Sequence, residues 1–137
     1  MIQAYADGGS RNNPGHAAWG FVIKEENKTI HSEGGYIGIA TNNIAEYTAL
    51  IKALEWLEIN KKNENIDFFL DSNLIVSQLN GIFKVKNADI REFVQKARQL
   101  EPSFKKITFT HIKRKKNKIK TQHNKTQQLF SILLMQN

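Results

Sequence analysis

The sequence contains no cysteine, so it can form no disulfide, and we expect a reducing, cytoplasmic setting. It has no stretch of roughly 18 apolar residues that would span a bilayer, so we expect a soluble protein with no membrane partner. The first residues also lack the basic and then apolar layout of a secretory signal peptide. These absences favour an ordinary globular protein over membrane proteins and disulfide-stabilised secreted domains.

Acidic residues are absent after Glu101, where nine of the 20 basic residues lie. All 13 acids lie at or before that position, and the formal net charge is +7. Because neutralising phosphates releases counterions, this surface favours a polyanionic partner such as nucleic acid. A basic run is, however, often only a solvated face.

The length of 137 residues suits one domain, and no internal repeat or linker divides residues 1–137. Hydrophobic periodicity and turn residues predict the following elements along the chain. They are three antiparallel strands (2–7, 17–25 and 28–39), a helix (43–59), a buried strand (66–71), two helices (72–81 and 87–101), a strand (105–113) and a helix-compatible tail (118–135). This order predicts an α/β fold with a mixed sheet.

Three carboxylates fall at positions where these elements should meet. Asp7 and Asp71 are predicted to end two strands, and Glu46 is predicted to lie in the first turn of the helix 43–59. The ends of adjacent strands in an α/β sheet form the usual crevice for a site. Converging carboxylates repel one another unless a hard cation neutralises them, and oxygen ligands without cysteine favour Mg²⁺ or Mn²⁺.

Two such ions held ~4 Å apart cleave phosphodiesters in line, so the carboxylates together with the basic surface indicate a nuclease. A structural interpretation stays open beside this one. An aspartate at a strand end is often a turn former, and a glutamate near a helix start is favourable at the positive end of the dipole.

Four segments carry a resemblance to a known family: "YADGGSRNNPGHAAWGFVI", "TNNIAEYTALIKALEWL", "LDSNLIVSQLNG" and "THIKRKKNK". In order and spacing they resemble the signature blocks of type 1 ribonuclease H, which cuts the RNA strand of an RNA/DNA hybrid. The resemblance runs from Ile2 to about Lys118. It implies a ribonuclease H-like fold, a five-stranded mixed sheet with three antiparallel first strands and flanking helices.

The resemblance also implies roles for particular residues. Asp7 would bridge two Mg²⁺ or Mn²⁺ ions, Glu46 and Asp71 would hold the ion on the leaving-group side, and His111 would relay protons or release product. Uncharged donors can read a ribose 2′-hydroxyl and the minor groove, although capping and turn formation explain several of them equally well. The implied substrate-binding residues are Gly8, Asn13, Thr41, Asn42, Asn43, Asn73 and Arg114.

Two departures from the family pattern stand out. Only a short segment joins Asn80 to Asn87, so the chain resembles the compact form without the basic protrusion that grips the DNA strand in some members. The basic residues after Glu101 either replace that grip or are a solvated face. The second departure is the fourth carboxylate of the family, whose position falls on Thr121, ten residues after His111.

Thr121 and Asn124 are alternative, weaker ligands for that fourth position, and neither assignment is decided. Residues 118–137 are atypical for the family, and a changed reading frame near Lys118 is a third explanation. We expect a monomeric endonuclease of reduced activity that leaves 5′-phosphate and 3′-hydroxyl ends. The alternatives are an impaired module that binds hybrid or double-stranded nucleic acid, and a damaged gene product.

Overall fold

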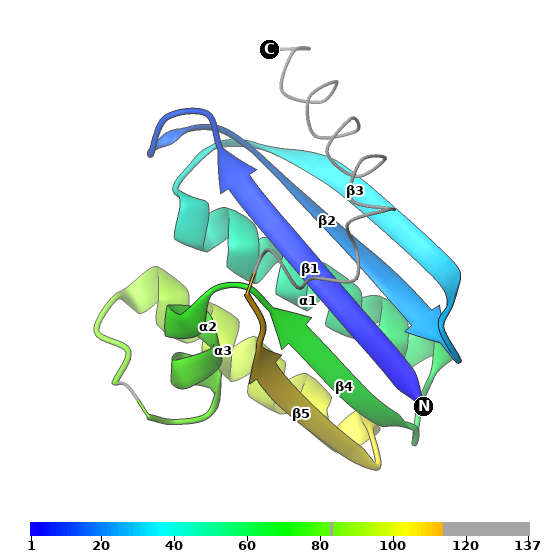
Figure 1. Ribbon diagram of the computed structural model, residues 1–137. Coiled ribbons are helices and arrows are strands. Elements are labelled where there is room, and N and C mark those ends of the chain that lie inside the picture. Colours follow the sequence, from blue (N-terminus) through cyan, green and yellow to red (C-terminus); the bar gives the residue numbers. More distant parts are fainter. Residues whose placement is uncertain (83, 114–137) are drawn as a thin grey trace.

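A computed structural model describes residues 1–82 and 84–113 of the chain (Figure 1). Every element that the sequence predicted within these residues is present. The elements are β1 (Ile2–Ser10), β2 (Gly15–Glu25), β3 (Lys28–Ala40), α1 (Asn42–Asn60), β4 (Asn65–Leu70), α2 (Asn73–Leu79), α3 (Ala88–Leu100), the short 3₁₀ helix η1 (Glu101–Ser103) and β5 (Lys106–His111).

The five strands form one sheet in the order β3-β2-β1-β4-β5. Strand β2 pairs antiparallel with both β1 and β3, whereas β1 with β4 and β4 with β5 pair in parallel. Helix α1 packs on β1 and β2, and α3 packs beside α1, so these helices form a layer on one face of the sheet (Figure 1). The predicted mixed sheet is therefore confirmed. None of the described helices is long and apolar enough to cross a membrane.

Helix α1 begins at Asn42 because Thr41 caps it, with Thr41 Oγ1 accepting a hydrogen bond from the backbone N–H of Ile44 at 3.2 Å. The helix then presents a buried face to the sheet. Alanines recur on it at four-residue spacing, and all three are fully buried: Ala45, Ala49 and Ala53. Small side chains in one row allow the helix backbone to come close to the strands beneath it.

The closest approach of helix and sheet lies at Gly8, which is buried in β1. A Cβ atom added at Gly8 would lie 2.2 Å from the carbonyl oxygen of Ala45 and 2.6 Å from the backbone nitrogen of Glu46. No side chain fits in that space. Glycine therefore lets the backbone of β1 contact the backbone of α1 at this point.

Strand β1 is longer than the sequence predicted. The prediction that it ends at Asp7 was wrong, because pairing with β2 continues through Gly8, Gly9 and Ser10. The Gly-, Asn- and Pro-rich composition of residues 8–16 suggested a wide loop, whereas the turn between β1 and β2 spans only residues 11–14. Asp7 consequently lies within a strand, where its backbone is held on one side by Gly20 of β2.

We expect Gly8→Ala to destabilise the fold by about 3 kcal/mol or more, since the added methyl group overlaps the α1 backbone rather than a flexible side chain. Urea denaturation measures the change in the free energy of unfolding. The neighbouring Gly9→Ala is the matched control, because the atom nearest to its Cβ is Asn42 Oδ1 at 3.8 Å. Equal losses in the two variants would contradict a specific contact at Gly8.

Candidate functional site

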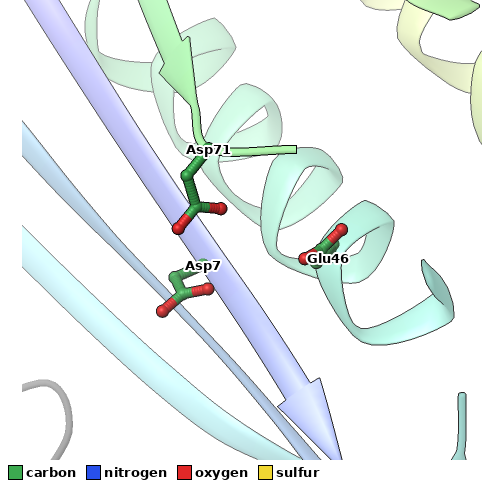
Figure 2. A group of neighbouring side chains, drawn as sticks. All are labelled: Asp7, Glu46 and Asp71. Atoms are coloured by element: carbon green, nitrogen blue, oxygen red, sulfur yellow. The ribbon is translucent and has the colours of Figure 1, made fainter. Parts of the chain in front are cut away.

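Three acids from three separate elements converge beside the central strand β1, at the carboxyl end of β4 (Figure 2). Asp7 comes from β1, Asp71 follows β4, and Glu46 comes from α1. One carboxylate oxygen of each lies within 4.8 Å of the others, and all three side chains are half-buried. The structure thus brings together the acids that the sequence predicted to converge.

The parallel pairing of β1 with β4 sets the positions of the two aspartates. Tyr5 of β1 pairs with Phe69 of β4. Continuing this register by two residues along both strands brings Asp7 level with Asp71. Because the register is shared, two residues far apart in the sequence reach the same end of the sheet.

Glu46 is the fifth residue of α1, so the prediction that it lies in the first turn was wrong. The helix starts one residue earlier than the periodicity indicated, since Thr41 acts as its cap. The favourable effect of a helix dipole on an acid falls off within the first turn. The purely structural explanation for Glu46 is therefore weaker than the sequence suggested.

A half-buried hydrogen bond beside the acids links α2 to α1. The Tyr47 hydroxyl donates a hydrogen bond to Gln78 Oε1 of α2 at 2.5 Å. Burial and then the nearby Glu46 carboxylate raise the pKa of Tyr47, and the smaller influence of Arg98 lowers it. The phenol therefore stays protonated and remains a donor.

The connection from β4 to α2 is short and fixed at both ends. Asp71 follows the last residue of β4, and Ser72 caps α2, with its Oγ accepting from the N–H of Ile75 at 3.3 Å. Asp71 thus has little freedom to leave the cluster. A half-buried set of oxygen ligands without cysteine or histidine suits a hard divalent cation.

The uncharged residues predicted to bind substrate border the start of α1. The N–H of Asn42 donates to Asn13 Oδ1 at 3.1 Å, which joins the β1–β2 turn to the helix. Asn13 and Asn43 are exposed, and Thr41 serves as the cap. Sequence reasoning missed Ser10, whose N–H and Oγ both donate to Asn42 Oδ1; a serine beside a turn carries no signal of such a partner.

The other predicted site residues differ in their exposure to solvent. Asn73 is exposed at the first position of α2, and His111 is exposed at the end of β5, paired with Leu70 next to Asp71. Gly8 is buried against α1, so a structural role is evident for it. The remaining candidates, Arg114, Thr121 and Asn124, and the atypical segment 118–137 lie outside the described residues.

Comparison with known proteins identifies the family. The family model described as "Reverse transcriptase-like" matches residues 5–123. Ribonuclease HI of Halobacterium salinarum is 42% identical over 117 residues, which cover 85% of this chain and 58% of that protein. The crystal structure of LC11-RNase H1 in complex with an RNA/DNA hybrid superposes with a TM-score of 0.81 at 40% identity, covering 86% of this chain and 89% of that one. The chain belongs to the type 1 ribonuclease H family.

A second solved ribonuclease H, RNase H1 from the halophilic archaeon Halobacterium salinarum, gives a TM-score of 0.79 at 39% identity and covers 85% of this chain and 88% of that chain. The chain spans a smaller share of the curated ribonuclease H relatives, 58% of the Halobacterium protein and 51% of the Campylobacter jejuni protein. The resemblance that the sequence motifs carry is thus confirmed, together with the predicted ribonuclease H-like fold.

We expect Mn²⁺ to stabilise the protein through the acid cluster. An ion that binds the folded state, at a concentration of 100 times its Kd, adds about 2.7 kcal/mol to the free energy of unfolding. Asp71→Asn removes one carboxylate from the cluster, so this variant should lose most of that stabilisation. Thermal unfolding with and without Mn²⁺ measures the difference. Asp67→Asn is the control, because Asp67 lies outside the cluster and accepts from Thr108 Oγ1. An equal Mn²⁺ effect in wild type and Asp71→Asn would place the ion elsewhere.

Proposed function

We propose that this chain is a metal-dependent endonuclease that hydrolyses the RNA strand of RNA/DNA hybrids and leaves 5′-phosphate and 3′-hydroxyl ends. The observation that carries the proposal is the convergence of Asp7, Glu46 and Asp71 within 4.8 Å, in a chain of the ribonuclease H family. The hybrid bound by the similar LC11-RNase H1 supports the choice of substrate.

Asp7, Glu46 and Asp71 would together hold two Mg²⁺ or Mn²⁺ ions. When bound, the ions activate the attacking water and stabilise the leaving oxygen. The chain itself contributes a fixed geometry, because each acid comes from an element whose position is set by backbone pairing or packing. That preorganisation avoids reordering the ligands during the reaction.

The uncharged surface beside the acids would place the substrate. Asn13, Thr41, Asn42 and Asn43 lie around the start of α1, where uncharged groups can contact a 2′-hydroxyl or the minor groove without adding negative charge to the site. Asn73 extends this surface to α2. These contacts orient the hybrid over the acid cluster.

His111 would move a proton or help product leave. Its side chain is exposed at the end of β5, and its backbone pairs with Leu70, the residue before Asp71. An imidazole has one nitrogen that can accept a hydrogen bond and one that can donate, so it could contact both water and a phosphate oxygen here.

A second function, binding of a hybrid without cutting it, is favoured by one observation. The chain carries no acid after Glu101, so the fourth family carboxylate is missing. Thr121 or Asn124 would then supply a neutral oxygen in its place. Such a weaker ligand lowers activity and favours Mn²⁺, whose coordination tolerates poorer ligands.

Cleavage of an end-labelled RNA/DNA hybrid separates the two functions. We expect wild type to cut the RNA strand with Mg²⁺ or Mn²⁺. Asp7→Asn should lower the cleavage rate at least about 1000-fold, because the metal ions stabilise the transition state by several kcal/mol and each 1.36 kcal/mol changes the rate tenfold. Asp67→Asn is the control at full rate. Binding of the hybrid by wild type with no metal-dependent cleavage would sink the enzyme proposal.

We expect Thr121→Asp to raise the cleavage rate at least about tenfold with Mg²⁺, because a carboxylate is a stronger ligand than a hydroxyl. Single-turnover cleavage of the same hybrid measures the rate. Asn124→Asp is the companion variant that tests the other position. A rate unchanged in both variants would exclude a missing fourth ligand as the limit on activity.

A further inference from the structure

A small hydrogen-bond network joins the end of β1, the β1–β2 turn and the start of α1. Both donors of Ser10 meet one atom, since its N–H lies 2.9 Å and its Oγ 3.0 Å from Asn42 Oδ1. The N–H of Asn42 in turn lies 3.1 Å from Asn13 Oδ1. Three short contacts thus engage the carboxamides of two asparagines.

The donors in this network decide which way each carboxamide points. A backbone N–H can only donate, so the atom facing the N–H of Ser10 must be the oxygen of Asn42, and the atom facing the N–H of Asn42 must be the oxygen of Asn13. The Nδ2 groups therefore point away from these contacts. Within the described part of the chain, neither Nδ2 has a hydrogen-bond partner.

We propose that Ser10 is a positioning residue that holds the Asn42 carboxamide with its N–H donors available to the nucleic acid, while the Asn42 backbone orients Asn13 in the same way. This inference rests on the proposed function. Ser10 itself acts through Asn42. These N–H donors would contact hydrogen-bond acceptors of the hybrid. Phosphate oxygens, the ribose 2′-oxygen and the minor-groove edges of the bases all offer such acceptors.

N–H donors that are fixed in place can contact a hybrid of any sequence. Every base pair presents acceptors in the minor groove, at purine N3 and pyrimidine O2, so fixed N–H groups find a partner on any hybrid. A carboxamide free to flip would present its oxygen to the hybrid half of the time. That oxygen would then face acceptors of the nucleic acid, with which it cannot form a hydrogen bond. Fixing the orientation before binding removes this cost.

Ser10→Ala tests the inference because it deletes the Oγ donor and keeps the backbone N–H. We expect KM for the hybrid to rise about 3- to 10-fold, as expected when a side chain must be ordered on binding, with kcat nearly unchanged. Ser10→Thr keeps the hydroxyl and should restore KM. Asn42→Asp keeps the acceptor for Ser10 but replaces the outward donors, and should raise KM further than Ser10→Ala.

Ser103→Ala is the matched control, because the Ser103 hydroxyl also donates one hydrogen bond, to Glu58 Oε2 at 3.0 Å. Glu58 is not part of the acid cluster. Equal KM values for Ser10→Ala and Ser103→Ala would overturn the proposal. So would a loss in kcat alone, or a failure of threonine to restore KM.

A second measurement needs no nucleic acid. The ¹⁵N side-chain amide signals of Asn42 should report a rigid carboxamide in wild type and larger-amplitude motion in Ser10→Ala, where the backbone N–H of residue 10 is the one remaining donor of the pair. Unchanged Asn42 signals in that variant would overturn the positioning role. A wild-type chain that neither binds nor cuts the hybrid would instead refute the proposed function, so the two failures are distinguishable.

Discussion

The site depends on one close contact, between the backbone of β1 at Gly8 and the backbone of α1 at Ala45 and Glu46. Asp7 precedes Gly8 in the strand, and Glu46 follows Ala45 in the helix. The contact that seats the helix therefore also brings two carboxylates together. A larger side chain at Gly8 would separate them, so the packing of the core and the geometry of the acids are a single constraint.

Helix α1 links the acid cluster to the uncharged surface. Asn42 and Glu46 are four residues apart, so they lie on the same face of the helix, one turn above the other. Ser10 fixes the carboxamide of Asn42, while Gly8 fixes the depth of Glu46. A substrate that contacts the first turn of α1 is thereby placed against the second, where the acids converge (Figure 2).

The sequence predicted the sheet, the helices and the three acids, because alternation, helical periodicity and four ordered motifs are local signals. It did not predict what depends on distant partners. Strand β1 runs to Ser10 only because β2 pairs with it, and Ser10 matters only because Asn42 lies within reach. Helix α1 begins at Asn42, one residue earlier than the periodicity indicated, which puts Glu46 beyond the first turn. The fourth ligand, at Thr121 or Asn124, stays a prediction.

The most direct test of the account is the anomalous diffraction of Mn²⁺ in crystals of the chain with an uncleaved RNA/DNA hybrid. We predict a manganese peak within about 2.5 Å of carboxylate oxygens from Asp7 and at least one of Glu46 and Asp71, the distance expected of a hard cation, beside the scissile phosphate of the RNA strand. A hybrid bound elsewhere, or manganese bound away from these three acids, would contradict it.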